Sequence, residues 1–346
     1  MKAAVYYGPD APWPQKLMAI EEMPTPTPGP GEVLIKVAAC GLCRTDLEYL
    51  KGEGVTPKRP PIILGHEPSG TVAEVGAGVD GVIRGQKVLV ATPIPCRNCH
   101  WCCIGQENLC PNMVIVGATQ DGAFAEYVIS PAGGVYSLPD GLPLEESCII
   151  TDAVGSSYHA LYNRAKVKPQ DTVAIYGASG GLGLICVQLA AAVGAKVIAI
   201  GRKKWKLDKA KELGATEIIS VVEVDHVEKV IRRMTGGGVD ISVDVTGAPY
   251  MIESAFLATK PGGTLVVAGF SFHKIQLNIN HLNWFERNVI GSKNYCAADM
   301  PEILKLVKQG VINLDKVVSH RFRLEEINNA YQMLDRGEIL RGVIIP

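Results

Sequence analysis

After residue 170, short apolar segments alternate with longer segments of helical periodicity, and this alternation limits the possible folds more than any other feature. Parallel strands need a crossover connection of a dozen or more residues, so strands separated by helices predict βαβ units. We therefore predict an α/β domain with a doubly wound parallel sheet covered by helices on both faces. The predicted strands are 172–176, 197–200, 217–220, 240–245 and 264–269. The predicted helices are 181–193, 203–213, 225–234 and 249–259.

The chain before about residue 150 has a different character, with many prolines and glycines between short apolar runs. The runs 33–40, 69–76 and 87–92 are typical of strands joined by turns rather than by long helices. The last segment ends in another short apolar run and is expected to return to this β-rich part. A length of 346 residues suggests two domains. We expect them to comprise residues 1–153 with 292–346, and residues 154–291.

The overall charge gives no reason to expect a nucleic acid or a membrane surface as partner. Thirty-four basic side chains face 35 acidic ones, for a net charge of −1. The most apolar window, 184–200, is interrupted by Gln188, Gly194 and Lys196, and a membrane helix needs about 20 apolar residues. The first residues lack the apolar region of a signal peptide. We expect a cytoplasmic protein, in a compartment that keeps thiols reduced.

Five cysteines lie within fifteen residues, and four of them are separated by two, two and seven residues. In a reducing compartment such a cluster is more typical of a metal site than of disulfides, and four thiolates can surround Zn²⁺ as a tetrahedron. A site with four protein ligands has no open position, so we predict a structural zinc lobe over about residues 94–112. An iron–sulfur cluster and a set of ordinary buried thiols are the alternatives. The predicted ligands are Cys96, Cys99, Cys102 and Cys110, with Cys103 as a surplus thiol.

A glycine-rich turn follows the strand 172–176 and leads directly into a helix. Glycine lets the backbone approach a pyrophosphate, and the N–H groups at the helix start bind its oxygens. In a βαβ context this pattern predicts a dinucleotide site; a tight turn with no ligand is the alternative. The predicted contacts are Gly177, Ser179, Gly180, Gly181 and Leu182.

The end of the second strand indicates which dinucleotide is preferred. An acidic side chain there would accept hydrogen bonds from the ribose 2′-hydroxyl of NAD. This chain instead has Gly201, Arg202 and Lys203, followed by Lys204. Cations can bind a 2′-phosphate, so we predict a preference for NADP(H). A solvated basic helix start is the alternative.

A second metal site is predicted from residues that are distant in the sequence. Cys43 lies in ACGLCRTDLEY, and His66 and Glu67 lie in LGHEPSG. Each alone is a weak signal. Together, a thiolate, an imidazole and a carboxylate form the open ligand set of a catalytic zinc site.

The run Gly65, His66, Glu67, Gly70 and Gly76, the cysteine lobe and the glycine turn together resemble the zinc-containing alcohol dehydrogenases of the medium-chain dehydrogenase/reductase superfamily. The resemblance extends over essentially the whole chain. It implies a GroES-like β-rich catalytic domain and a Rossmann cofactor domain. It also implies two zinc ions, one catalytic and one structural, and hydride transfer between an alcohol and the nicotinamide.

The resemblance implies a third zinc ligand shortly before the cofactor domain. Asp152 lies at the matching position, with Cys148 as a near rival, and Glu67 is either a direct ligand or a neighbour of the ligands. Thr45 matches the hydroxyl that takes the alcohol proton, and Asp46 matches the carboxylate that bonds the histidine ligand. Glu48 replaces a frequent histidine and is either a proton relay or a surface carboxylate.

Further cofactor contacts follow only from the resemblance. They are Ser156, Gly269 and Phe270 beside the nicotinamide, and Arg44 and Arg341 at the pyrophosphate. The expected partners are a small alcohol, aldehyde or ketone and further copies of the chain, as a dimer or tetramer. A polyol or sugar dehydrogenase, a zinc-free enoyl or quinone reductase and a zinc-ribbon nucleic-acid-binding protein are the alternatives.

Overall fold

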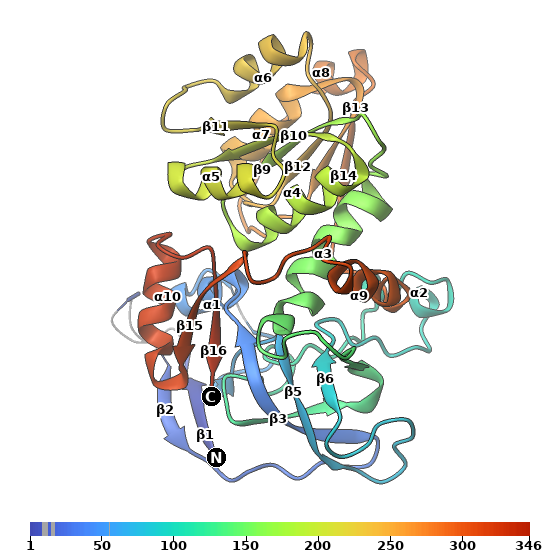
Figure 1. Cartoon of the computed structure of the whole chain (residues 1–346), viewed down its shortest axis with the longest axis vertical. Helices are drawn as coiled ribbons and strands as arrows, with labels where there is room; N and C mark the ends of the chain where they lie inside the picture. The colour runs from blue at the N-terminus through green and yellow to red at the C-terminus, as the bar shows by residue number, and fades with distance from the viewer. Residues whose placement is uncertain (9–12, 15–17, 55) are drawn as a thin grey trace. The chain divides into compact units, whose positions relative to one another are not determined.

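The computed structural model describes residues 1–8, 13–14, 18–54 and 56–346. These residues divide into two compact units (Figure 1). Unit 1 comprises Met1–Asp152 and Asn313–Pro346, and unit 2 comprises Ala153–Ile312. Within the described residues, no helix combines the length and apolar character needed to cross a bilayer.

Unit 2 is built on a six-stranded sheet in the order β11-β10-β9-β12-β13-β14, and every neighbouring pair is parallel. Both faces of the sheet are covered. In β9, Ala174 and Tyr176 belong to the apolar cluster with helices α6 and α7, while the alternate residues Val173 and Ile175 are also fully buried. The strands are β9 (Thr172–Tyr176), β10 (Lys196–Gly201), β11 (Glu217–Ser220), β12 (Val239–Asp244), β13 (Thr259–Val267) and β14 (Asn288–Gly291).

The helices of unit 2 confirm the predicted alternation. The helix predicted over 181–193 has these bounds in the structure, and the strand predicted over 217–220 does as well. The helices are α3 (Ala153–Tyr158), α4 (Gly181–Val193), α5 (Lys204–Glu212), α6 (Val227–Thr235), α7 (Pro249–Ala258), α8 (Ile279–Trp284) and α9 (Met300–Lys308), with a π-helical turn over His159–Arg164.

The strands β10 and β12 differ from their predicted bounds by one residue at each end, but β13 differs by more. β13 begins at Thr259, where a helix end was predicted, and stops at Val267 instead of Gly269. Its pairing with β12 shifts register between Val239 and Ile241, so an irregularity accommodates a Pro-Gly-Gly sequence typical of a turn. The end is early because the N–H groups of residues 268 and 269 both bond the carbonyl of Asp244.

Unit 1 is β-rich, as predicted. Its larger sheet has the order β15-β16-β3-β5-β6-β8, with β7 also paired to β3, and its smaller sheet has the order β2-β1-β4. The strands are β1 (Lys2–Tyr6), β2 (Ala19–Glu22), β3 (Glu32–Gly41), β4 (Ile62–Ile63), β5 (Pro68–Val75), β6 (Lys87–Val90), β7 (Tyr127–Pro131), β8 (Val135–Ser137), β15 (Val318–Arg323) and β16 (Arg341–Ile345). The helices are α1 (Arg44–Lys51), α2 (His100–Cys103) and α10 (Ile327–Asp335).

The C-terminal segment joins the β-rich unit later than predicted. β16 pairs antiparallel with β3, which confirms the return of the chain end. However, residues 292–312 group with unit 2, so the return is at Asn313 and not at residue 292. The reason is local packing: Asn163 donates to Asp299 at 2.9 Å, and the ring of Tyr295 packs against Gly155. The other boundary lies one residue before its predicted position.

Candidate active site

Three segments of unit 1 bring the predicted metal ligands together. Cys43 precedes the first turn of α1, directly after β3. His66 and Glu67 lie in the loop between β4 and β5. Gly65, directly before them, has φ +95°, a conformation that favours glycine. Asp152 follows the 3₁₀ helix Glu146–Thr151.

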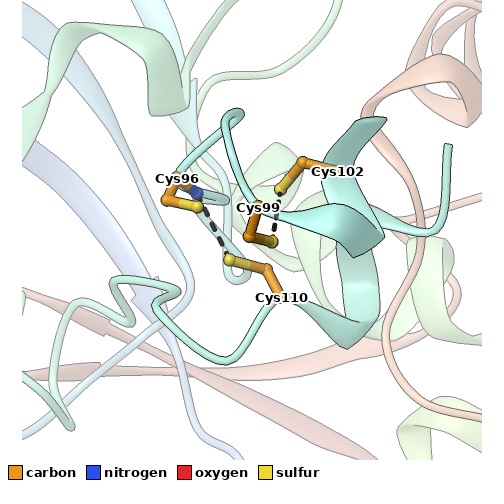
Figure 2. Close-up of side chains that lie close together, drawn as sticks. All are labelled: Cys96, Cys99, Cys102 and Cys110. Carbon is orange, nitrogen blue, oxygen red and sulfur yellow. Dashed lines mark hydrogen bonds between the residues drawn. The ribbon is translucent and has the colours of Figure 1, made fainter. Parts of the chain in front are cut away.

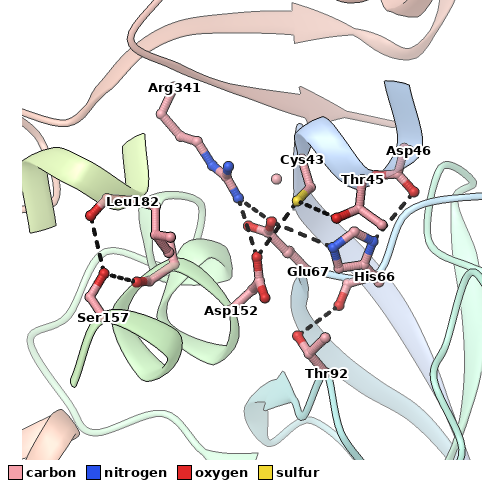
Figure 3. A network of polar contacts seen from close by, with 12 residues as sticks. Cys43, Thr45, Asp46, His66, Glu67, Thr92, Asp152, Ser157, Leu182 and Arg341 are labelled. Atoms are coloured by element: carbon pink, nitrogen blue, oxygen red, sulfur yellow. Dashed lines mark hydrogen bonds and ion pairs between the residues drawn. The ribbon is translucent and has the colours of Figure 1, made fainter. Parts of the chain in front are cut away.

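One donor atom from each of Cys43, His66, Glu67 and Asp152 lies within 4.8 Å of the other three (Figure 3). The Cys43 Sγ is 3.7 Å from Asp152 Oδ2, and His66 Nε2 is 3.8 Å from Glu67 Oε1. Sulfur, nitrogen and carboxylate oxygen are the donors that Zn²⁺ takes in proteins. Glu67 Oε1 is the carboxylate oxygen nearest to His66 Nε2, whereas Oε2 is buried against Gly41 with no hydrogen-bond partner among the described residues. The residues therefore fit a zinc ion.

The structure also separates the two candidates for the third ligand. Asp152 belongs to the cluster, whereas the Cys148 thiol is fully buried and lies outside it. Burial raises the pKa of Cys148 well above its usual value.

Arg341 has a different partner in this structure from the predicted pyrophosphate. Its side chain is buried at the start of β16, and its Nη2 donates to Glu67 Oε1. The same nitrogen lies 3.9 Å from Asp152 Oδ2. The guanidinium thus offsets the negative charge of two carboxylates in the cluster, and a phosphate contact for it stays a prediction.

Burial and the neighbouring charges together set the pKa values of Glu67 and His66. Burial raises the pKa of Glu67 to about 7, although the Arg341 charge acts in the opposite direction. For His66, burial lowers the pKa, but the neighbouring Asp46 carboxylate and Cys43 more than offset this and the pKa lies well above its usual value. In the absence of metal, both groups hold protons more strongly than they would in water.

Contacts with neighbouring side chains hold His66 in place. Its Nδ1 lies 3.3 Å from Asp46 Oδ1, as the resemblance implied, and Thr92 donates to the His66 carbonyl at 3.2 Å. The other oxygen of Asp46 accepts a hydrogen bond from the hydroxyl of Tyr331 at 3.1 Å. Sequence reasoning missed Tyr331, because an aromatic residue in an amphipathic helix is typical of a core position.

The remaining predicted residues of α1 surround the cluster to different extents. Thr45 Oγ1 lies 3.6 Å from Cys43 Sγ and is therefore beside the ligands. Glu48 is half-buried and pairs with Arg44, whose Nε lies 3.3 Å from Glu48 Oε1. Burial, with a hydrogen bond to Glu53, raises the pKa of Glu48. The proton-relay role of Glu48 and the phosphate contact of Arg44 stay predictions.

The cysteine lobe brings its four predicted ligands together (Figure 2). The sulfurs of Cys96, Cys99, Cys102 and Cys110 lie within 4.8 Å of one another, and those of Cys99 and Cys102 are 3.5 Å apart. A zinc ion with four sulfurs at about 2.3 Å requires sulfur separations of about 3.8 Å, so the set fits such an ion. Cys103 is exposed and lies outside the group.

The glycine turn of unit 2 has the predicted strand–turn–helix form. Gly177, directly after β9, has φ +89°, and Gly180 precedes the first residue of α4. A Cβ on Gly183 would lie 2.2 Å from the carbonyl oxygen of Gly177, so this glycine lets the turn pack closely. Ser179 and Leu182 lie in the turn and the first turn of α4.

The end of β10 lies beside this turn. A Cβ built on Gly201 would meet the hydroxyl of Ser179 at 2.6 Å. Arg202 is exposed, and Lys203 caps α5. Lys204 is instead paired with Asp208 at 2.8 Å, one turn along the same helix.

The residues predicted at the nicotinamide are also in unit 2. Ser156 is half-buried in α3. Gly269 packs closely against the backbone of Gly247. A Cβ on Gly269 would lie 2.1 Å from the nitrogen of Gly247. Phe270 is exposed and meets Phe272 edge-on. Their contacts with a cofactor stay predictions.

Comparison with known proteins gives matches over the whole chain. Residues 29–140 match the alcohol dehydrogenase GroES-like domain, and residues 181–309 match the zinc-binding dehydrogenase domain. Alcohol dehydrogenase 6 of Peromyscus maniculatus is 33% identical, with 100% of this chain and 97% of the relative covered. A sorbitol dehydrogenase of Halalkalibacterium halodurans is 33% identical, with 95% of each chain covered. Relatives named L-threonine 3-dehydrogenase are similarly identical.

A solved structure is similar over the same extent. The putative zinc-binding dehydrogenase from Sinorhizobium meliloti 1021, bound to NADP, has a TM-score of 0.90 and 30% identity. The match covers 100% of this chain and 99% of that one.

Proposed function

The chain belongs to the zinc-containing alcohol dehydrogenase family of the medium-chain dehydrogenase/reductase superfamily, and we propose that it is an alcohol dehydrogenase that holds two zinc ions and prefers NADP(H). It would transfer hydride reversibly between an alcohol carbon and the nicotinamide. The observation that supports this reaction best is the cluster of Cys43, His66, Glu67 and Asp152. It places sulfur, nitrogen and oxygen atoms where they could bind one metal ion.

Each residue of the cluster has a task in this proposal. Cys43, His66 and Asp152 would hold the zinc, with Glu67 as a fourth donor. A bound zinc ion supplies Lewis acidity, which lowers the pKa of an alcohol oxygen beside it. Thr45 would accept the proton of that alcohol while it gives up its own hydroxyl proton, for which Glu48 would be the relay, and Asp46 would keep His66 in one orientation.

The rival functions are less well supported. A zinc-free enoyl or quinone reductase would have no use for the Cys43 and His66 pair, which lies in one cluster with two carboxylates. A zinc-ribbon protein that binds nucleic acid would have no use for the glycine turn in unit 2. A polyol or sugar dehydrogenase remains the second candidate, because a relative of similar identity is named sorbitol dehydrogenase.

A panel of substrates tests the reaction. Primary and secondary alcohols, polyols and the matching carbonyl compounds would be assayed with NADP(H) and with NAD(H), beside metal analysis. We expect two zinc ions per chain and activity that is lost on exhaustive chelation. Fewer zinc ions, or activity that survives chelation, would contradict the proposal, and turnover of polyols alone would favour the second candidate.

The preference for NADP(H) is proposed from the end of β10. No carboxylate follows this strand, the exposed Arg202 and the neighbouring Lys203 provide positive charge, and Ser179 presents its hydroxyl toward Gly201. A ribose 2′-phosphate placed there would meet cations and a hydroxyl donor, whereas a 2′-hydroxyl would find no acceptor carboxylate. The relative of known structure bound to NADP is compatible with this assignment.

The structure also determines how this preference should be tested. Gly201→Asp alone would force its Cβ against Ser179, so the variant should combine it with Ser179→Gly and Arg202→Ala. We expect kcat/KM with NADP relative to NAD to fall by about a hundredfold, because an ionic contact is lost and a repulsive carboxylate is added. Lys211→Ala, which removes an exposed cation from α5, is the control and should leave the ratio of kcat/KM values unchanged. An unchanged ratio in the triple variant would overturn the assignment.

The proposal includes a cytosolic homo-oligomer, either a dimer or a tetramer. All ten cysteines are free thiols, which suits a reducing compartment. β14 is an edge strand of the parallel sheet, and Ile279 and Trp284 shortly before it are 75% and 83% exposed, as suits a surface covered by another copy. Light scattering of the purified protein distinguishes a monomer, a dimer and a tetramer.

A further inference from the structure

A buried hydrogen-bonded chain connects the C-terminal helix to the metal cluster. Tyr331 in α10 donates from its hydroxyl to Asp46 Oδ2 at 3.1 Å, and Asp46 Oδ1 lies 3.3 Å from His66 Nδ1. Tyr331 and Asp46 are both 0% exposed, and they are separated by 285 residues in the sequence. Each oxygen of the carboxylate therefore has one partner, and neither faces water.

The surroundings hold this hydroxyl in place. The ring of Tyr331 packs edge-on against Phe124, with 6.0 Å between the ring centres. One turn further along α10, Asp335 accepts from Lys51 at 2.6 Å, so α10 is joined to α1 at a second point. The rotation of Asp46 about its side-chain bonds is thus limited by a group from the opposite end of the chain.

The direction of the hydrogen bonds follows from the charges. Burial and the nearby Asp46 carboxylate raise the pKa of Tyr331 well above its usual value, so its oxygen keeps the proton that it donates. With Oδ2 occupied in this way, Oδ1 is the acceptor that remains for His66 Nδ1–H. The histidine then has its Nε2, on the side of Glu67, available to a metal ion.

We propose that Tyr331 is a positioning residue for the open metal cluster, acting through Asp46 on the orientation and tautomer of His66. This inference rests on the proposed function, because it takes the cluster to hold zinc. It makes α10 part of the metal site, although the helix contributes no ligand. Because α10 belongs to the C-terminal segment, the return of this segment to unit 1 also contributes to the metal site.

The test measures how strongly each site retains zinc. Tyr331→Phe removes only the hydroxyl, and a chelator competition would follow the zinc of the open cluster beside that of the cysteine lobe. We expect the open cluster to bind zinc about tenfold more weakly in this variant, as is typical when a partner behind a ligand is lost. The lobe should be unchanged and serves as an internal reference. Tyr162→Phe, which removes a tyrosine hydroxyl that bonds a backbone carbonyl in unit 2, should change neither site.

A double-mutant cycle tests the route of the effect. If Tyr331 acts through Asp46, Tyr331→Phe should cause no further loss of zinc in an Asp46→Asn background. A full additional loss there would overturn the route. Equal zinc retention in Tyr331→Phe and wild type would overturn the inference alone, and this comparison decides the matter even if the Asp46→Asn proteins do not fold. A wild-type cluster that binds no zinc would overturn both the inference and the proposed function.

Discussion

The two candidate metal clusters of unit 1 are built on opposite plans. The lobe takes four thiols from fifteen consecutive residues, with a single donor type and short connections. The open cluster takes a thiol, an imidazole and two carboxylates from positions between Cys43 and Asp152, and a layer of charged groups surrounds it. The lobe ligands are close together in the sequence, whereas the packing of unit 1 brings together the residues of the open cluster.

This difference separates stability from reactivity. Four thiolates satisfy a zinc ion and leave no position for a substrate, so the lobe should contribute to folding alone. Asp46 and Arg341 contact members of the open cluster and can tune their charge and orientation. Catalysis by a metal ion depends on both. Variants at the two clusters should therefore have different effects.

The largest expected effect is on activity at the open cluster. His66→Ala removes a ligand, and the loss of a Lewis acid is worth several kcal/mol in the transition state, or a fall in kcat/KM of about a thousandfold. The lobe should keep its zinc. His100→Ala, an exposed histidine beside the lobe ligands, is the matched control and should behave as wild type. Comparable activity in His66→Ala would contradict the assignment of the site.

The next effect is on stability at the lobe. Cys99→Ser should release one zinc ion per chain and lower the melting temperature by about 5 °C, because the bound metal contributes folding free energy. Activity measured well below that temperature should stay within about a factor of three. A loss of activity as large as that of His66→Ala would erase the proposed division between the clusters.

The charged layer of the open cluster has no counterpart in the lobe. Above pH 7, where Glu67 is ionised, Glu67→Gln removes the hydrogen-bonded partner of the buried Arg341 guanidinium and leaves it only the more distant Asp152, and breaking a buried pair costs about 3 kcal/mol. Chemical denaturation of the variant should show this loss. Glu74→Gln, an exposed position on the adjoining strand, should change the free energy of unfolding by less than about 0.5 kcal/mol.

The pH dependence of stability should reveal the same charged groups in the metal-free protein. Burial raises the pKa of Glu67 to about 7, above an unfolded value of about 4.3. Between these values the folded state binds more protons than the unfolded state, so the stability from Glu67 is present at low pH and is lost as pH rises. The raised pKa of His66 acts in the same direction. From pH 5 to pH 8 we expect a loss on the order of 2 kcal/mol from Glu67 that Glu67→Gln abolishes, and an equal slope in both proteins would be incompatible with it.

The smallest effect should come from the surplus thiol of the lobe. Cys103 is exposed and outside the ligand group, so Cys103→Ser should change the melting temperature by less than about 1 °C and leave the zinc content as it is. A loss of zinc would mean that the lobe uses a different set of four cysteines.

Features that depend on neighbours in the sequence could be predicted well. The helix over 181–193 follows from its apolar residues and flanking glycines, and the four lobe cysteines follow from their spacing alone. The start of β13 at Thr259 could not, because its pairing with β12 overrides a sequence typical of a turn. The partner of Arg341 could not either, since a cation near the chain end matches several roles until its surroundings are known.

The sequence by itself thus determined the two types of domain, the grouping of the four lobe cysteines, and the glycine turn between β9 and α4. Each of these depends on periodicity or spacing over a few tens of residues, where chain geometry limits the alternatives. Only the tertiary structure decided that Asp152 rather than Cys148 lies in the open cluster, the bond between Arg341 and Glu67, and the contact of Tyr331 with Asp46. These pairs join residues that lie far apart along the chain, and their contacts exist only because the packing of strands and helices buries them together.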